Sequence, residues 1–248
     1  MNAICAYLDN LEQVLSTVRK TQSETLETGA HMLYEAVEND HSAFAFGCSH
    51  AGLLALEMYY RSGGMATINP IRAPGLCLDI DPATMTSEME RLPGYGRLII
   101  DSQPIQANDV VIIHSVSGRN IVPVDAALRC RELGAKVIAL TNLSYSQNVS
   151  SRHPSGLRLF ETADLVLDNC GCTGDGSLTL PGLSERVGPT STAIGAAMLN
   201  AMMCRAVELI VENGGIAPVF LSANIDGGDA HNREMLQKYG KHIFYMGH

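Results

Sequence analysis

Residues 109–118, with the sequence DVVIIHSVSG, decide the fold, because a run of apolar side chains passes there directly into small and hydroxyl-bearing residues. The run is continuous and does not alternate between apolar and polar residues, which indicates a strand buried on both faces. Such a strand belongs in a parallel sheet that helices cover on both sides. The small residues then predict a loop at the carboxyl end of the strand, where open α/β sheets bind their ligands.

Four further apolar runs lie on either side of this stretch, at residues 43–46, 66–71, 136–141 and 164–168. Helical segments separate several of them. One follows the first run and ends at Arg61, before two glycines, and another extends from about residue 121 to Gly134 with Pro123 in its first turn. Strands that alternate with helices predict an α/β fold with a doubly wound parallel sheet.

The N-terminal segment has apolar residues in steps of three and four, which predicts a helix over residues 3–20. Thr21 followed by Glu24 resembles a capping box, so a second helix is expected from there toward Asn39, and the two would form a helical hairpin. Such a hairpin serves as a packing appendage or as a dimer arm. The apolar positions of the first helix are Ile4, Leu8, Leu11, Leu15 and Val18.

We expect a single domain with a helical appendage over residues 1–40, a core over 41–215 and a C-terminal tail over 216–248. Two stretches are expected to be irregular: residues 73–106, apart from a helical turn at 86–91, and residues 171–188. A long helix rich in Ala and Met is expected over residues 190–213. Its apolar residues surround it almost completely, which indicates burial in the core or at a subunit contact.

Composition excludes several classes of function. Of the 248 residues, 46% are apolar and 17% charged, which favours a large core, and the net charge of −9 with no basic run argues against a nucleic acid partner. Seven scattered cysteines are typical of buried thiols in a reducing compartment. We see no signal peptide, and the apolar stretch 193–209 is shorter than the roughly 20 residues that span a bilayer. We therefore expect a cytoplasmic protein that contacts no membrane.

Two loops carry the pattern of a phosphate site, residues 47–51 and residues 115–120. Each opens a helix, whose first N–H groups are unpaired and carry a partial positive charge. Ser49, Ser115 and Ser117 would add hydroxyl donors, Gly118 would let the backbone approach the ligand, and Arg119 would add a cation. Serine also caps helices without binding anything, so the structural alternative stays open. Neither a P-loop nor a dinucleotide fingerprint is present.

These residues resemble the SIS (sugar isomerase) domain family, in particular its phosphoheptose-isomerase-like members. The resemblance lies in residues 44–64 and 109–142, with Ser115-x-Ser117-Gly118 at their centre, and in the helix over 190–213. It implies a five-stranded parallel sheet and a phosphorylated sugar whose phosphate is held by the three serines and Asn120. It also implies a homodimer or homotetramer with the site near a subunit boundary.

The resemblance further implies that a glutamate on the helix after the first loop acts as the base. Glu57 is the only carboxylate on that helix, although its spacing from the loop differs from that in the well-studied isomerases. His50, beside the first loop, is a candidate for opening the sugar ring or protonating an oxygen. His231 lies in a Gly-rich tail segment and is a candidate for donation to a neighbouring subunit. A glutamate on a helix or a histidine in a loop is also an ordinary solvated residue, so these roles stay hypotheses.

No metal or other cofactor is expected. Zinc-bearing isomerase relatives carry a histidine on the last core helix, and residues 193–209 contain none. Cys170 and Cys172 form a pair without a partner pair, which is a weak signal for a metal.

Three functions remain open. The first is aldose–ketose isomerisation of a phosphosugar. The second is a dehydratase or lyase reaction, a β-elimination on an N-acetyl amino-sugar 6-phosphate, which the missing histidine favours. The third is a phosphosugar sensor without catalysis. Sensors of this family usually carry an attached DNA-binding domain, which we do not find in the chain, and this argues against the third.

Overall fold

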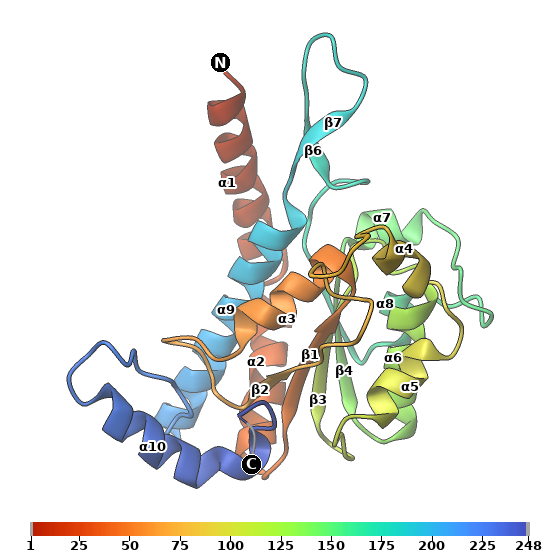
Figure 1. Ribbon diagram of the computed structural model, residues 1–248. Coiled ribbons are helices and arrows are strands. Elements are labelled where there is room, and N and C mark those ends of the chain that lie inside the picture. Colours follow the sequence, from red (N-terminus) through yellow and green to blue (C-terminus); the bar gives the residue numbers. More distant parts are fainter. Residues whose placement is uncertain (1, 247–248) are drawn as a thin grey trace.

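The computed structural model describes residues 2–246, and a five-stranded parallel sheet lies at its centre (Figure 1). Across the sheet the order is β2-β1-β3-β4-β5, and every pair of neighbours is parallel. The predicted fold class, an α/β fold with a doubly wound five-stranded parallel sheet, is therefore confirmed. The strands are β1 (Ala43–Gly47), β2 (Ile68–Pro70), β3 (Val110–His114), β4 (Lys136–Thr141) and β5 (Leu165–Asp168).

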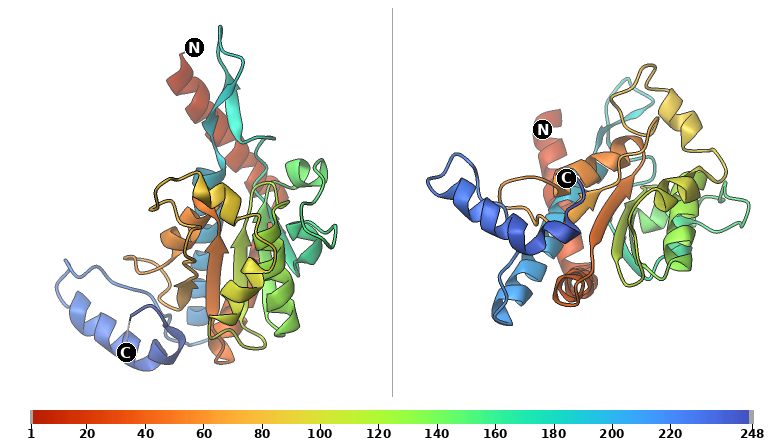
Figure 2. Two further views of the ribbon diagram at one scale, coloured as in Figure 1. Left: turned by 45° about the vertical axis from the view of Figure 1, so that its right-hand side comes forward. Right: turned by 60° about the horizontal axis from the view of Figure 1, so that its bottom comes forward.

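Side chains on the central strands alternate between two separate apolar layers. Ala45 and Ile112 face one layer, and Phe46 and Ile113 face the other. The first layer is completed by α2 (Ser23–Glu38), α3 (Leu53–Met58) and α9 (Ser191–Glu212), and the second by α5 (Tyr95–Asp101), α6 (Ile121–Glu132) and α8 (Leu159–Thr162). Figure 2 shows these helices on opposite sides of the sheet. Burial on both faces explains why the strands have continuous apolar runs.

The expected N-terminal hairpin is wrong. Helix α1 (Ala3–Thr21) is followed by α2 after a single residue, Gln22, which keeps a right-handed helical backbone. The N–H of Gln22 donates to the carbonyl of Val18, and the N–H of Leu26 donates to the carbonyl of Gln22. Helical bonding thus continues across the junction, and α1 projects beyond the sheet instead of folding back on α2 (Figure 1).

The capping box is also absent from this junction, because Thr21 belongs to α1 and its hydroxyl donates to the carbonyl of Thr17. Thr and Ser side chains within a helix often bond the carbonyl one turn earlier, so the sequence signature by itself did not establish a new helix start.

The two stretches expected to be irregular contain regular elements. Residues 73–106 hold α4 (Met85–Met89) and α5. Residues 171–188 hold most of an antiparallel hairpin of β6 (Gly176–Thr179) and β7 (Arg186–Pro189), which projects beside α1 (Figure 1). The elements are only 4–7 residues long, so no apolar period distinguishes them from a loop.

Two helices differ in length from the expectation. Helix α3 ends at Met58 and not at Arg61, because Tyr59 is extended and Tyr60 has a φ of 43°. Helix α9 has 22 residues, which gives it the length and hydropathy of a membrane span. Half of that span is nevertheless buried inside the protein, where it packs against α2 and α3, so α9 is a core helix of this fold.

The chain reverses direction across the sheet between β1 and β3. From β1 it crosses to β2 at one edge, then returns to place β3 on the other side of β1. Adjacent loops at the carboxyl ends of β1 and β3 therefore leave in opposite directions, which opens a crevice for ligands in sheets of this type. Both loops with the predicted phosphate pattern lie at this point.

Candidate functional site

The candidate site is formed by the two loops that follow β1 and β3. Gly47 and His114 are directly opposite each other at the ends of these strands. Cys48 and Ser115 follow them, so the two loops begin side by side at roughly the 4.8 Å spacing of neighbouring strands. The topology thus joins two segments that are more than 60 residues apart in the sequence.

The first loop turns sharply into a short 3-10 helix over Ser49–Gly52, which leads into α3. Ser49 has a φ of 53°, and its N–H donates to the carbonyl of Leu76 at 2.8 Å. A side chain at Gly47 would place Cβ 2.5 Å from the carbonyl carbon of Ala51, so only glycine fits there. A left-handed serine costs energy, and such strain is found more often at functional sites.

Hydrogen bonds to neighbouring parts of the chain hold the second loop in place. Gly118 has a φ of 59°, and its carbonyl accepts the N–H of Leu159 at 2.8 Å. The carbonyl of Val116 accepts both the N–H of Asn142 and the hydroxyl of Thr141, each at 3.0 Å. The backbone is therefore fixed before any ligand binds, which reduces the entropy cost of binding.

The three serine hydroxyls of these loops are free to bind. Among residues 2–246, the hydroxyls of Ser49, Ser115 and Ser117 make no hydrogen bond to another group. None of the three is among the side-chain atoms that are both unpaired and shielded from solvent. Unpaired hydroxyls that remain in contact with solvent, beside the start of α6, are suitable donors to an anion.

Arg119 and Asn120 point toward a neighbouring loop, residues 148–158. The guanidinium of Arg119 donates to the Ser150 hydroxyl at 3.1 Å, and Arg152 donates to the side-chain oxygen of Asn120 at 2.6 Å. The backbone N–H of Arg152 also donates to the carbonyl of Arg119 at 2.8 Å. This loop therefore brings a second arginine to the start of α6, which sequence reasoning missed because 32 residues separate Arg152 from Asn120.

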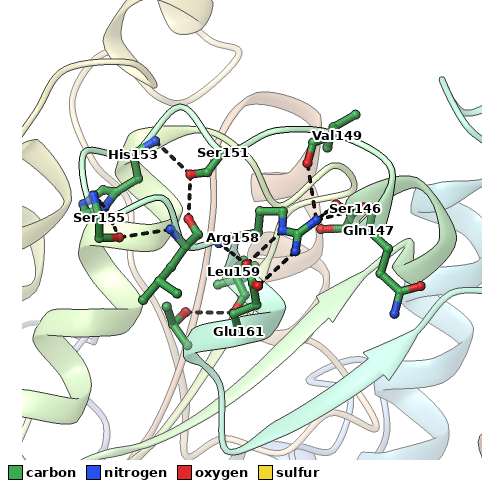
Figure 3. A network of polar contacts seen from close by, with 11 residues as sticks. Ser146, Gln147, Val149, Ser151, His153, Ser155, Arg158, Leu159 and Glu161 are labelled. Atoms are coloured by element: carbon green, nitrogen blue, oxygen red, sulfur yellow. Dashed lines mark hydrogen bonds and ion pairs between the residues drawn. The ribbon is translucent and has the colours of Figure 1, made fainter.

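Figure 3 shows how this loop is anchored. Arg158 donates to the carbonyls of Ser146, Gln147 and Val149 and pairs with Glu161, and the Ser151 hydroxyl donates to the carbonyl of Leu157 at 2.6 Å. These bonds fix the shape of the loop that carries Arg152.

Sequence reasoning also missed Glu90, which follows α4. Its carbonyl accepts the N–H of Val122 in the first turn of α6 at 3.1 Å. Burial raises the pKa of its carboxyl, and this outweighs the Asn120 hydrogen bond and the nearby Arg91 and Arg152, which lower it. The position was expected to lie at an isolated helical turn, and no motif near Glu90 marks it, because the fold alone brings it to the site.

The side chain of His114, the residue before the second loop, forms a hydrogen bond with the first loop. It is fully buried at the end of β3, and its Nδ1 lies 3.1 Å from the carbonyl oxygen of Ala51. Burial lowers its pKa to about 4, while the bond to Ala51 and the charge of Asp175 raise it less. The ring is neutral near pH 7, so Nδ1 carries the proton that bonds Ala51 and Nε2 carries none.

This burial predicts a specific acid sensitivity. An exposed histidine has a pKa near 6.5, so below that pH residue 114 is protonated in the unfolded chain while His114 stays neutral in the folded chain. Because the unfolded state then binds more protons, the free energy of unfolding falls as the pH decreases. At pH 5 the loss relative to pH 7.5 is ~2 kcal/mol. In urea unfolding measurements at both pH values, His114→Gln should lose less stability than the wild type by about that amount. Equal losses in both proteins would contradict the burial of a neutral ring.

The three predicted acid–base residues lie in different surroundings. His50 is exposed beside Ser49. Glu57 is half-exposed on the side of α3 that faces α9, where it pairs with Arg61 and accepts the Asn200 side chain at 3.2 Å. The cavity lined by Glu57 is distinct from the one lined by Ser49, although Leu56 borders both.

His231 lies in the first turn of α10 (Gly228–Tyr239), and its Nε2 is 3.0 Å from the carbonyl oxygen of Val219. Figure 1 shows α10 at the opposite end of the molecule from the two loops. The two cysteines make separate contacts, Cys170 with Thr21 and Cys172 with the carbonyl of Gly176. Within residues 2–246, no group of three or more His, Cys, Asp or Glu is placed to hold a metal.

Comparison with known proteins connects this geometry to a family. A model of the SIS domain matches residues 6–142. The chain is 43% identical over 246 residues to the UPF0309 protein of Shouchella clausii, covering 99% of this chain and 100% of that protein. It is 37% identical over 240 residues to the UPF0309 protein of Streptomyces coelicolor, covering 96% of each.

Solved structures share the fold. The chain superposes on a phosphoheptose isomerase from Francisella tularensis with a TM-score of 0.53 at 15% identity, covering 83% of this chain and 98% of that one. The sheet and its covering helices are therefore arranged in the same way in the two proteins.

Proposed function

The chain belongs to the SIS domain family, within its UPF0309 group, and we propose that it binds a phosphorylated sugar and transfers a proton on it, as an aldose–ketose isomerase. One observation carries the proposal: two loops with unpaired serine hydroxyls meet at the reversal point of the sheet, where each leads into a helix. Backbone N–H groups and hydroxyls at that position suit a phosphate dianion. The solved relative with this fold is itself described as a phosphoheptose isomerase.

The phosphate is held by Ser49, Ser115 and Ser117, by the backbone at Gly118 and by the first turn of α6. The Arg119 side chain contributes positive charge from its place beside the loop, and Asn120 is held at the start of α6 by Arg152. This arrangement fixes the sugar by its charged end, and the reacting carbons then extend away from the sheet. Fixing the phosphate lets binding energy position the carbons that react.

Isomerisation moves one proton between adjacent carbons through an enediol. Glu57 is the proposed base, and His50 is the proposed acid that opens the ring or protonates the oxygen. Glu57 and Ser49 line different cavities of one chain, and Leu56 borders both. His231, at the far end of the same chain, can act only on the site of a neighbouring copy.

Assembly into a homodimer or homotetramer is part of this proposal. Part of the apolar face of α1 is open to solvent in the single chain: Ile4 is 70% exposed, Leu8 52% and Leu15 40%, while Leu11 and Val18 pack against the core. Unpartnered apolar residues on one helix face favour a protein contact. The unpaired cysteines support a reducing, cytoplasmic location, and the net charge of −9 disfavours a nucleic acid partner.

A second reaction is favoured by one observation. Helix α9 contains no histidine, whereas the family resemblance places one on this helix in the zinc-bearing isomerases. The same base then removes the proton next to a carbonyl, and the neighbouring hydroxyl leaves as water. The substrate of such a dehydratase or lyase is an N-acetyl amino-sugar 6-phosphate.

Product analysis separates the reactions. The protein is incubated with fructose 6-phosphate, sedoheptulose 7-phosphate and N-acetylglucosamine 6-phosphate, and products are followed by mass spectrometry and NMR. A new isomer of unchanged mass supports the isomerase, and loss of water supports the dehydratase. A raised melting temperature without any product indicates a sensor, and no interaction with any phosphosugar contradicts the proposal.

The role of Glu57 is tested with a matched pair of variants. Glu57→Gln is expected to bind the phosphosugar and to lose turnover by ~100-fold or more, because the base is removed. Arg61→Gln breaks the same ion pair but keeps the carboxylate, so its turnover should stay within a few fold of the wild type. If both variants lose turnover equally, turnover depends on the ion pair between Glu57 and Arg61, and the proposed role of Glu57 as the base is wrong.

A further inference from the structure

Arg72 lies at the carboxyl end of β2, the edge strand next to β1. Pro70 is opposite Ala45, and the N–H of Ile71 donates to the carbonyl of Ala45 at 2.8 Å, so the pairing of the two strands continues past β2. The same register places Arg72 beside Gly47, where the first loop begins. A third segment therefore borders the candidate site at this edge of the sheet.

Arg72 and Ser49 line one cavity. The other residues around it are glycine, alanine, leucine, isoleucine and cysteine, so among the described residues Arg72 brings its only charge and Ser49 its only hydroxyl. The cavity is narrow, with a volume of about 20 Å³, which is room for roughly one water-sized group. A ligand can therefore place a single oxygen beside the guanidinium, in surroundings that are mostly apolar.

The guanidinium of Arg72 has no acidic partner. No carboxylate among residues 2–246 forms an ion pair with it. Its central carbon lies instead over the ring of Tyr59, 5.9 Å from the ring centre. An aromatic face attracts a guanidinium but leaves its N–H groups available. The charge of Arg72 is thus open to an oxygen of a ligand.

The contact with Tyr59 connects Arg72 to the proposed base. Tyr59 and Glu57 line the same cavity, and Leu56 borders both that cavity and the one that Arg72 shares with Ser49. Arg72 therefore lies where the cavity of the first loop meets the cavity of the base.

The order of the strands indicates which part of the ligand Arg72 meets. Strand β1 lies between β2 and β3, so the end of β2 is about two strand spacings, ~10 Å, from the loop that follows β3. The phosphate of the proposed ligand is held by the loops after β1 and β3. A sugar that extends from there to Glu57 brings its own oxygens, and not its phosphate, to Arg72.

We propose that Arg72 binds the sugar oxygen on which negative charge develops when Glu57 removes a proton from carbon. The inference rests on the proposed function and deepens it, because it adds a group that stabilises the charged intermediate. A fixed cation in mostly apolar surroundings stabilises such an oxygen more than water does.

The step balances as follows in isomerisation. Glu57 takes the proton from the carbon next to the carbonyl, the electrons of that C–H bond form a carbon–carbon double bond, and the carbonyl π electrons move to the oxygen beside Arg72. His50 protonates this enediolate oxygen to give the enediol. Glu57 then returns its proton to the other carbon, while His50 takes the proton of the second hydroxyl. In the alternative elimination the same oxygen carries the charge until the neighbouring hydroxyl leaves as water with the proton of His50.

This role predicts that Arg72→Gln weakens binding of the charged intermediate and not of the uncharged sugar. The variant should lower kcat ~100-fold or more, which is the usual effect of removing one donor to such an oxygen. Two inhibitors separate the states: for fructose 6-phosphate, sorbitol 6-phosphate has no carbonyl, and 5-phosphoarabinonohydroxamate mimics the enediolate. The dissociation constant of the first should change by less than about threefold, and that of the second should rise ~100-fold, in step with kcat. Arg131→Gln, at an exposed arginine in the last turn of α6, is the matched control and should behave like the wild type.

Arg72→Lys is the second variant, and it takes the place of Arg72→Gln if that protein does not fold. It keeps the positive charge but loses the planar set of donors, so its kcat should lie between those of the wild type and Arg72→Gln. Its loss of affinity for the hydroxamate should equal its loss of kcat, and a loss of kcat without a loss of that affinity would overturn the inference.

The outcomes separate this inference from the proposed function. If the wild type converts a phosphosugar and Arg72→Gln does so at a similar rate, Arg72 is an ordinary solvated side chain and the inference is overturned, while the proposed function stands. Equal weakening of both inhibitors would mean that Arg72 binds the phosphate, which also overturns it. If the wild type binds a phosphosugar without converting it, the inference falls together with the catalytic part of the proposed function, and if it binds none, the phosphate site falls as well.

Discussion

Replacement of Gly118 by valine is expected to weaken phosphosugar binding ~100-fold or more in a chain that remains folded. Gly118 has a φ of 59°, a conformation that costs a residue with a side chain roughly 1–2 kcal/mol. A Cβ there would lie 2.7 Å from the Ser146 hydroxyl and 3.3 Å from the Cβ of Leu159, so the loop has to move away from both. Movement displaces the hydroxyl of Ser117 and the N–H groups that follow it. The loss of two charge-assisted hydrogen bonds weakens binding ~100-fold or more.

The measurement is a calorimetric titration of both proteins with the same phosphosugar. Gly156→Val is the control, because Gly156 also has a positive φ of 76° but a side chain there would meet no atom within 4 Å. A valine at Gly156 also has to adopt a positive φ, but its side chain does not crowd the site. The affinity of this variant for the phosphosugar should therefore remain within a few fold of the wild type. Equal affinity in Gly118→Val and Gly156→Val would mean that the loop around Gly118 does not bind the ligand.

Removal of both hydroxyls from the second loop should have an effect of similar size. Each hydrogen bond to a charged group contributes about 1.5–3 kcal/mol, so Ser115→Ala and Ser117→Ala together should raise the dissociation constant by ~100-fold or more. The folded state should change little, because neither hydroxyl bonds another group among residues 2–246. Ser144→Ala, at an exposed serine of α7 (Leu143–Gln147), is the control.

Inorganic phosphate provides a second measurement for the same double variant. If the serines bind the phosphate group, phosphate should compete with the sugar in the wild type and lose that ability in the double variant. Competition that persists unchanged would place the phosphate elsewhere.

The sheet could be predicted from sequence because burial on both faces leaves a direct pattern. Residues 110–113 are apolar without interruption, and β3 occupies residues 110–114 with both faces covered. The loops were predictable for a related reason, since small residues directly after such a strand must lie at its carboxyl end. Their meeting at the reversal point followed once the order of the strands was known.

The N-terminal helices show where local patterns fail. Thr21 and Glu24 have the types and spacing of a capping box, yet Gln22 continues the helical bonding and the chain does not turn. The choice between a turn and a bend depends on what α1 and α2 pack against. Helix α2 lies on α9, whereas α1 extends past the core, and neither contact is encoded near residue 21.

The acid–base part of the site was harder to predict than the phosphate part. Glu90 and Arg152 lie in segments without a period or motif. Arg152 reaches Asn120, and the carbonyl of Glu90 reaches Val122, only because the chain folds over the start of α6. Glu57 was assigned from a resemblance, and in the single chain it faces α9 beside Arg61. A charged side chain acquires its chemistry from neighbours that are distant in sequence, so its type alone does not identify it.

Titration of the wild type with a sugar phosphate, and with the same sugar lacking its phosphate, shows whether the protein recognises the phosphate group. The proposed site consists of donors for an anion, so we expect the phosphorylated sugar to bind at least ~100-fold more tightly. We also expect the preference to disappear when Ser115 and Ser117 are both replaced by alanine. Equal affinity for the two sugars, or a preference that survives in the double variant, would contradict a phosphosugar site at the ends of β1 and β3.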